Sequence, residues 1–195
     1  MRSSFDKLIS WTGIIVAAVL LVAGGLLVWA SSFATSNVHD QLAQQQITMP
    51  AAAALTTPDM KANLSQYAGQ ELTTGAQAKA YADHYIQAHM NEQADGKTYS
   101  QVSGEYMAAL KADPTAQATQ DLGQLRQTLF MGTTLRGMLL NAYAFATLGT
   151  IAMWAAIAAF IGSAVLFVLG FLGLRHAHKV APVEAPEIEK IPATA

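Results

Sequence analysis

The chain has 195 residues, of which 52% are hydrophobic and 12% are charged, and its net charge is −2. An ordinary soluble domain carries about 25% charged residues. The basic residues form no cluster that could follow a phosphate backbone, so we expect no nucleic-acid partner. The chain contains no cysteine, which excludes disulfides, thiolate catalysis and cysteine-based zinc or iron–sulfur sites.

Two long stretches contain no charged side chain at all. They cover residues 9–38 and residues 137–174. A charged group at the centre of a bilayer costs about 2.5–3.5 kcal/mol on insertion scales, so charge-free stretches of this length are typical of membrane spans. The sequence therefore predicts an all-α membrane protein with two transmembrane helices, at residues 9–31 and 148–174.

Tryptophans mark both ends of the first predicted span. Trp11 and Trp29 would lie about 27 Å apart at about 1.5 Å per helical residue, close to the hydrocarbon thickness of about 30 Å. Aromatic anchors at the two interfaces are typical of membrane spans. A cleaved signal peptide is the alternative, with small residues near 31–34 as the cleavage site. Its apolar part is normally only about 7–15 residues long, so we favour a retained span.

Positive charges flank the two predicted spans on their outer ends. Arg2 and Lys7 precede the first span, and Arg175 and Lys179 follow the second. Between residues 31 and 136 there are six Lys and Arg against nine Asp and Glu, a net of −3. The positive-inside rule then places both termini in the cytoplasm. We expect a multi-pass protein of the cytoplasmic (inner) membrane with a cytoplasmic N-terminus at 1–8, an extracytoplasmic helical domain at 32–147, and a disordered cytoplasmic tail at 175–195.

Both predicted spans carry small residues at helical spacing, which lets helix backbones approach closely in lipid. We favour packing of the two spans on each other, and docking against another protein's helices is the alternative. The small residues that we expect to form these faces are Gly13, Ala17 and Gly25 in the first span, and Ala155, Ala158, Ala159, Gly162 and Ser163 in the second.

The central domain reads as short capped helices. The first predicted span continues as a helix to about residue 46. Thr57 with Pro58 starts a helix at residues 58–67, and Thr74 caps a helix to about residue 92 with one apolar face. Gln77 and Asp83 fall on the opposite, polar face of that helix.

The second half of the domain is predicted in the same way. Asp95 and Gly96 form a turn before a helix at residues 102–111. Asp113 and Pro114 repeat the cap-plus-proline start, and no further proline occurs before Pro182. We expect one very long helix from Pro114 into the membrane, with a separate interfacial helix as the alternative.

Residues 68–102 and their flanks carry short motifs in a recognisable order: AYAD with Ile86 and His89, Gly96 to Ser100, Asp113 with Pro114, and Leu135, Arg136 and Leu139. The chain resembles an actinobacterial family of two-span membrane proteins of unknown function. Some members are labelled aromatic ring-opening dioxygenases. The resemblance implies the two-span architecture, and it marks Tyr81, Asp83, His89, Gly96, Thr98, Tyr99 and Arg136 as motif residues.

The residues give the dioxygenase label no support. Iron chemistry of that kind uses two histidines and a carboxylate. His84 and His89 are five residues apart, about 140° around a helix, so they do not share a face, and His39 is distant in sequence. We expect no metal, no cofactor and no catalytic residue. For Arg136 we favour contact with the outer headgroups over pairing with Asp113 or Asp121.

The sequence thus favours a non-catalytic accessory or scaffold protein that binds the lipid bilayer and a membrane-protein partner, or associates with itself. A small-molecule or lipid-binding sensor module is the alternative. A cavity lined by Tyr81, Tyr85, Ile86, Leu125 and Leu129 would favour that alternative. A metal-dependent enzyme is a third hypothesis, which requires His39, His84 or His89 to converge with a carboxylate.

Overall fold

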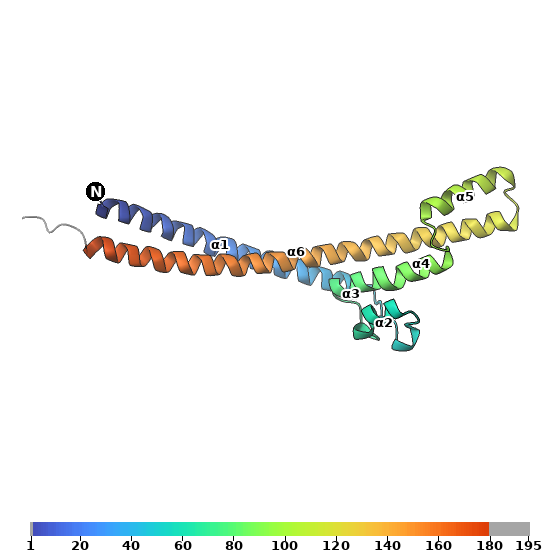
Figure 1. The fold of residues 1–195 in the computed structure, drawn as a ribbon, viewed down its shortest axis with the longest axis horizontal. Coiled ribbons are helices and arrows are strands. Elements are labelled where there is room, and N and C mark those ends of the chain that lie inside the picture. The colour runs from blue at the N-terminus through green and yellow to red at the C-terminus, as the bar shows by residue number, and fades with distance from the viewer. Residues whose placement is uncertain (1, 180–195) are drawn as a thin grey trace, which may run out of the picture. The chain divides into compact units, whose positions relative to one another are not determined.

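The computed structural model describes residues 2–179, and these residues are helical apart from turns and one isolated antiparallel bridge between Thr48 and Glu71 (Figure 1). The all-helical prediction is therefore confirmed for this part of the chain. The helices are α1 (Arg2–Ala43), α2 (Pro58–Leu64), α3 (Gly75–Ala80), α4 (Gln87–Gln93), α5 (Tyr99–Ala112) and α6 (Gln117–Lys179), with 3-10 turns at Ala52–Ala54 and Ser65–Tyr67 and a π-helical turn at Tyr81–Ile86 between α3 and α4.

Two of these helices, α1 and α6, are long and apolar enough to cross a membrane. The chain divides into two compact units. Unit 1 comprises Met1–Val28 and Trp154–Ala195, of which the structure describes 2–28 and 154–179, and unit 2 comprises Trp29–Met153. The predicted boundaries of the outer domain, at residues 32 and 147, stay predictions.

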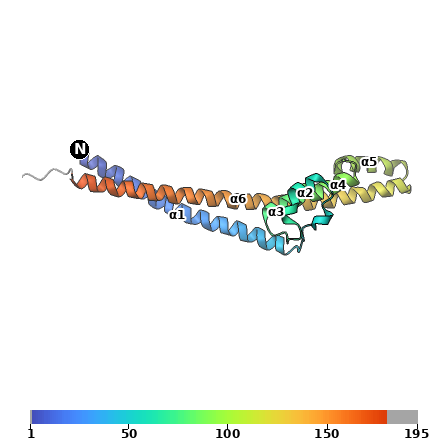
Figure 2. The ribbon, with the colours of Figure 1, turned by 60° about the horizontal axis from the view of Figure 1, so that its bottom comes forward.

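In unit 1, α1 and α6 run antiparallel and side by side (Figures 1 and 2). They bury small residues against each other at intervals of seven, which are Ser10, Ala17 and Gly24 on α1 and Ala156, Ser163, Gly170 and Ala177 on α6. A seven-residue repeat keeps the same face of each helix toward its partner, as in coiled coils.

Contacts across this seam are close. The Ser163 hydroxyl donates a hydrogen bond to the Ala17 carbonyl over 2.8 Å, and both residues are buried. A Cβ atom added to Gly170 would lie 3.0 Å from the Ser10 carbonyl oxygen and 2.8 Å from Ile14. Small side chains are therefore what allows the two backbones to approach.

The small residues singled out from the sequence fall on different sides of this seam. Gly13, Ala159 and Gly162 are half-buried beside Ala17 and Ser163. Gly25, Ala155 and Ala158 are exposed. The buried seam residues that the sequence reasoning missed are Ser10, Gly24, Ala156, Gly170 and Ala177.

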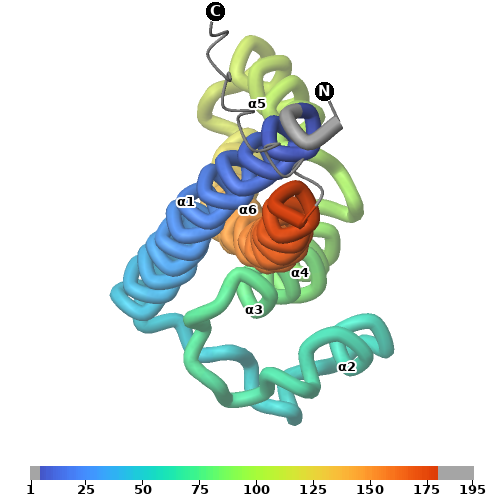
Figure 3. The backbone as a smooth tube through the Cα atoms, turned by 90° about the vertical axis from the view of Figure 1, so that its left-hand side faces the viewer, coloured from blue at the N-terminus to red at the C-terminus, as the bar shows by residue number. Residues whose placement is uncertain are grey.

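Unit 2 has a core of large apolar side chains. Its main cluster joins the second half of α1, α2, the segment from α3 to the π-helical turn, and α6, with Leu64, Leu72 and Leu139 at 1%, 1% and 3% exposure. Figure 3 follows the chain from α1 through α2 to α3. The expected caps are present, because Thr57 accepts from the Met60 amide and Thr74 forms a capping box with Gln77.

Gln77 differs from the prediction. The sequence predicts it on the polar face, but its side chain is buried, because it closes the capping box with Thr74 and its amide donates to the Gln70 side chain over 3.0 Å. Gln77 is polar because its side chain caps the helix, and not because it faces solvent.

A second, smaller cluster holds α5 against α6. It contains Ala94, Val102 and Leu129, all nearly fully buried. The Arg126 guanidinium lies 5.8 Å from the Tyr99 ring and 5.4 Å from the Tyr106 ring, and its Nε donates to the Ser103 hydroxyl. Cation–π contacts of this kind fix an arginine between two aromatic rings.

The two ends of α6 correct the prediction. The helix begins at Gln117 and not at Pro114, because Asp113 instead accepts from the Thr115 amide and hydroxyl in a local turn. At the other end α6 continues through Lys179, so residues 175–179 are helical and not part of a disordered tail. The remainder of the predicted tail lies outside the described residues. A single long helix, rather than a separate interfacial one, is what the structure shows.

Candidate functional site

The π-helical turn Tyr81–Ile86 gathers most of the polar and aromatic contacts of unit 2. The Gln87 amide donates to the Ala82 carbonyl, five residues back, where an α-helix would bond four residues back. π-helical turns are rare in proteins, and those that occur are often found at functional sites. The sequence reasoning missed it, because the residues of YADHYI are compatible with an ordinary α-helix.

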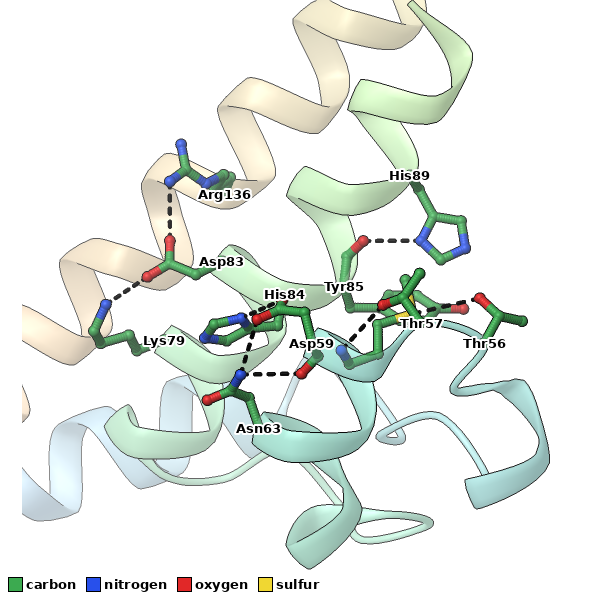
Figure 4. A network of polar contacts seen from close by, with 11 residues as sticks. Thr56, Thr57, Asp59, Asn63, Lys79, Asp83, His84, Tyr85, His89 and Arg136 are labelled. Atoms are coloured by element: carbon green, nitrogen blue, oxygen red, sulfur yellow. Dashed lines mark hydrogen bonds and ion pairs between the residues drawn. The ribbon is translucent and has the colours of Figure 1, made fainter. Parts of the chain in front are cut away.

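Asp83 in this turn bridges two basic side chains (Figure 4). The Lys79 ammonium donates to Oδ2, and Nη2 of Arg136 donates to Oδ1 over 2.9 Å. The Lys79 hydrogen bond is the main cause that lowers the pKa of Asp83, and Arg136 lowers it further against the opposing effect of burial. The Lys79 ammonium also lies 5.5 Å from the centroid of the Tyr143 ring.

Arg136 therefore has a partner that the sequence did not suggest. We expected contact with lipid headgroups, or else with Asp113 or Asp121, whereas the structure pairs Arg136 with Asp83. Its Nε atom is buried and has no hydrogen-bond partner among the described residues. The pair connects the π-helical turn to α6 across 53 sequence positions, a separation that no local pattern reports.

His84 and Asp59 connect the same turn to α2. Nδ1 of His84 lies 2.8 Å from Asp59 Oδ2, and the Asn63 amide donates to the other carboxylate oxygen over 3.1 Å (Figure 4). Asp59 is mostly exposed and His84 is partly buried. This pair fixes α2 at the surface of the core.

His89 bonds its own helix. Its Nδ1 lies 2.8 Å from the Tyr85 carbonyl oxygen. A carbonyl only accepts, so Nδ1 carries the proton, and Nε2 of the neutral ring is left with a free lone pair. The Tyr85 ring lies between the rings of Tyr81 and His89, at centroid distances of 5.0 and 4.3 Å. Burial, with a smaller effect of Tyr85, raises the pKa of Tyr81.

A groove of about 290 Å³ lies between the α4 side of this segment and α6. It is lined by Tyr85, Ile86, His89, Met90, Gln93, Thr128, Met131, Gly132 and Leu135. Of the cavity expected from the sequence, the groove contains Tyr85 and Ile86. Leu129 is fully buried in the core instead, and Tyr81 and Leu125 do not line the groove.

The motif residues Gly96 and Thr98 have structural roles, and the three histidines of unit 2 each have a local or surface contact. Gly96 lies in a turn at φ +74°, next to Asp95 at φ +48°, and Thr98 caps α5 by a capping box with Gln101. His39 contacts Asp40, His84 contacts Asp59, and His89 bonds its own helix. Within residues 2–179, no group of three or more His, Asp or Glu side chains is arranged to hold a metal.

Comparison with protein-family models, with curated proteins and with solved structures gives no match for this chain. The resemblance to two-span actinobacterial proteins stays a prediction. The features that bear on function are the packing within each unit and the groove beside His89.

Proposed function

We propose that this chain is a two-span membrane protein that acts as a non-catalytic scaffold or accessory subunit. Both termini lie in the cytoplasm, and unit 2 lies outside it. The spans pair with each other through their small-residue seam, and unit 2 binds a membrane-protein partner. The flanking positive charges support this orientation.

The observation that carries the membrane part of the proposal is the packing of unit 1. Its two helices bury serine, alanine and glycine and expose their large apolar side chains; Leu26, Trp154 and Phe167 are 63%, 68% and 56% exposed. In the most apolar 18-residue stretch of each helix, only 11% of the residues of α1 and 17% of those of α6 are buried. A core helix of a soluble protein would bury such windows, whereas a lipid-facing helix leaves them exposed.

The seam also supports retention of the first span over cleavage as a signal peptide. Ala17 accepts a hydrogen bond from Ser163, and Ser10 lies against Gly170. Removal of this segment would leave the buried face of α6 in unit 1 without its partner.

An apolar stripe on α6 supports the scaffold part. Met131, Leu135, Met138 and Phe145 are 40% to 66% exposed and recur at spacings of four, three and seven residues, so they lie along one side of the helix. Exposed apolar patches of this kind mark interaction surfaces. We assign this stripe to contact with a helix of the partner.

Photo-crosslinking in intact cells tests the partner. A benzophenone amino acid replaces Met138 in the stripe or, as a matched control on the same helix, the exposed polar Gln120. We expect a discrete protein adduct from position 138 and none from position 120. Equal labelling at both positions, or adducts with lipid alone, would contradict the scaffold.

Topology and pairing have their own test. Because the chain has no cysteine, an Ala17→Cys and Ser163→Cys pair crosslinks on a clean background. We expect the disulfide to form within one chain in membranes, and a cysteine at Gln120 to be labelled from outside the cell. Recovery of the protein in the supernatant after membranes are pelleted would overturn the proposal.

A second candidate function is a ligand-binding or sensor module. The groove beside His89 favours it, because it combines apolar walls with a few polar groups, as small-molecule sites do. The groove shares Met131 and Leu135 with the stripe, whereas Met138 and Phe145 lie outside it, so a ligand in the groove can be tested apart from crosslinking at Met138.

A further inference from the structure

The groove beside His89 contains three side chains that ligate soft metal ions. They are the imidazole of His89 and the thioethers of Met90 and Met131. Thioether sulfur selects Cu(I), and imidazole is a good ligand for copper. The chain has no cysteine, so methionine is its only source of sulfur ligands.

His89 is oriented as metal-binding histidines usually are. Ligating histidines almost always donate their second ring N–H to a carbonyl or carboxylate, which fixes the tautomer and the direction of the ring. Here Nδ1 is held by the Tyr85 carbonyl at 2.8 Å, and the Tyr85 ring packs at 4.3 Å from the imidazole. The nitrogen left for a ligand is Nε2.

The two methionines line the same groove from different helices. Met90 belongs to α4, and its sulfur lies so close to α6 that a Cβ atom on Gly132 would be 2.6 Å away. Met131 is the neighbour of Gly132 on α6 and is 55% exposed. Methionine has three rotatable bonds and a polarisable sulfur, so both thioethers can turn toward a common ion.

The rest of the lining argues against other metals. No Asp or Glu lines the groove, so it lacks the carboxylates that Mg²⁺ and Ca²⁺ sites and many zinc sites use. An apolar wall also penalises a double charge more than a single one. The donor set therefore suits a soft monovalent cation.

We propose that this groove binds one soft monovalent cation, Cu(I) or its redox-inert analogue Ag(I), through Nε2 of His89 and the sulfurs of Met90 and Met131. The inference names a ligand for the second candidate function and rests on the groove alone. It does not depend on the topology of the spans, and although Met131 belongs to both the stripe and the groove, the crosslinking position Met138 lies outside the groove, so the crosslinking tests can fail while this one succeeds.

The test uses the full chain purified in mild detergent. Ag(I) is bound by equilibrium dialysis and measured by mass spectrometry, and Cu(I) is competed against a chromogenic chelator under reducing conditions. We expect His89→Gln and Met131→Leu each to weaken binding of one equivalent at least about tenfold. Met138→Leu, on α6 outside the groove and 66% exposed, should bind like the wild type.

The His89→Gln variant keeps an amide donor for the Tyr85 carbonyl, so its fold is expected to persist, and circular dichroism checks its helicity. Unchanged binding in the double variant His89→Gln/Met131→Leu would place the ion on other histidines of the chain and overturn the proposal. Zn(II) bound as tightly as Ag(I), or no Ag(I) bound by the wild type, would overturn it as well.

Discussion

Unit 1 and unit 2 bury opposite kinds of side chain. The seam of unit 1 is built from Ser10, Ala17, Ser163 and Gly170, while most of its leucines and phenylalanines are exposed. Unit 2 buries Met49, Leu55, Leu64, Leu72 and Leu129 and exposes most of its charged side chains. The same chain, through the same two helices α1 and α6, thus follows two packing rules.

Two units in different solvents, as the proposed topology requires, would pack in these two ways. In water, burial of apolar area supplies about 25 cal/mol per Å², so unit 2 gains from hiding its large side chains. Unit 1 does not gain this energy, because most of its large apolar side chains are exposed. In lipid there is no hydrophobic drive between helices, and close backbone packing with interhelical hydrogen bonds takes its place. The packing of unit 1 fits the second solvent, in line with the proposed membrane spans.

The largest difference in stability between the two units is expected when one leucine in each is truncated to alanine. Leu129→Ala empties a fully buried site in unit 2 and should cost about 2–5 kcal/mol. Leu26→Ala removes the same atoms from a side chain in unit 1 that is 63% exposed, and should cost less than about 0.5 kcal/mol. Hydrogen exchange of unit 2, read as opening free energies, measures the first effect.

The control for this comparison is the exchange of α1 in detergent. We expect Leu26→Ala to leave the protection of both units unchanged. Equal losses for Leu26→Ala and Leu129→Ala would mean that unit 1 also hides its leucines from water, and the contrast between the units would be lost.

Much of the fold could be predicted from the sequence, because its signals are local. Thr57 and Thr74 are predicted caps, and the structure has caps at both. The helix predicted at residues 102–111 begins earlier, at Tyr99, because Thr98 caps it. The sequence predicts the start of the long helix at Pro114, three residues before its start at Gln117 in the structure, because an Asp-Pro pair also forms a turn. Local patterns give the elements but leave their ends uncertain by a few residues.

The seam was only partly recognised, although its signal was present. Ser10, Ala17, Gly24 and Ser31 recur every seven residues on α1, as do Gly149, Ala156, Ser163, Gly170 and Ala177 on α6. The predicted faces of small residues about four apart contain Ala17 and Ser163 of the seam, but they also contain Gly25, Ala155 and Ala158, which are exposed. The correct period was seven, because two long helices that stay in contact must repeat their face every 3.5 residues.

The candidate site was the least predictable part. Asp83 and Arg136 are 53 positions apart, and the π-helical turn has no sequence signature. The groove depends on the close approach of Met90 on α4 to Gly132 on α6. Such features depend on tertiary contacts, so a single sequence could name Tyr81, Asp83 and His89 as motif residues without showing what they contact.

Overpacking of the seam should give the next largest effect. Gly170→Val places side-chain atoms against the Ser10 carbonyl and Ile14, and should cost about 1–3 kcal/mol. Gly25→Val, on the exposed side of α1 with nothing within 4 Å, is the matched control and should be neutral. The yield of the Ala17→Cys/Ser163→Cys disulfide in membranes measures helix approach. An equal yield in both valine variants would argue that the seam is loose.

Acid should act on unit 2 through Asp83. Its pKa in the folded chain lies below the ordinary value of 3.8, so its ion pairs stabilise the fold above that pH and are lost as the pH falls through the folded pKa. Asp83→Asn should lower the stability of unit 2 by about 1–2 kcal/mol at neutral pH. In this variant the stability should also fall less steeply as the pH is lowered. Opening of residues 75–93 by hydrogen exchange between pH 6 and pH 3 is the measurement, with Asp121→Asn, an exposed carboxyl on α6, as control.

Equal acid sensitivity of the wild type and Asp83→Asn would mean that the Lys79–Asp83–Arg136 bridge does not hold the π-helical turn on α6. A variant that is less stable at neutral pH but whose stability falls with acid as steeply as that of the wild type would show that Asp83 acts through packing and not through its charge.

The smallest effect is expected from the hydrogen bond between Ser163 and Ala17 across the seam. Ser163→Ala removes the donor to the Ala17 carbonyl and should cost about 0.6 kcal/mol, measured by reversible unfolding in mixed micelles. Thr12→Ala is the control, since Thr12 bonds the Leu8 carbonyl of its own helix. The loss is small because, in the separated helices, a serine hydroxyl finds a carbonyl one turn back in its own helix. A cost of several kcal/mol would instead show a seam exposed to water when it opens, which would place unit 1 in the same solvent as unit 2.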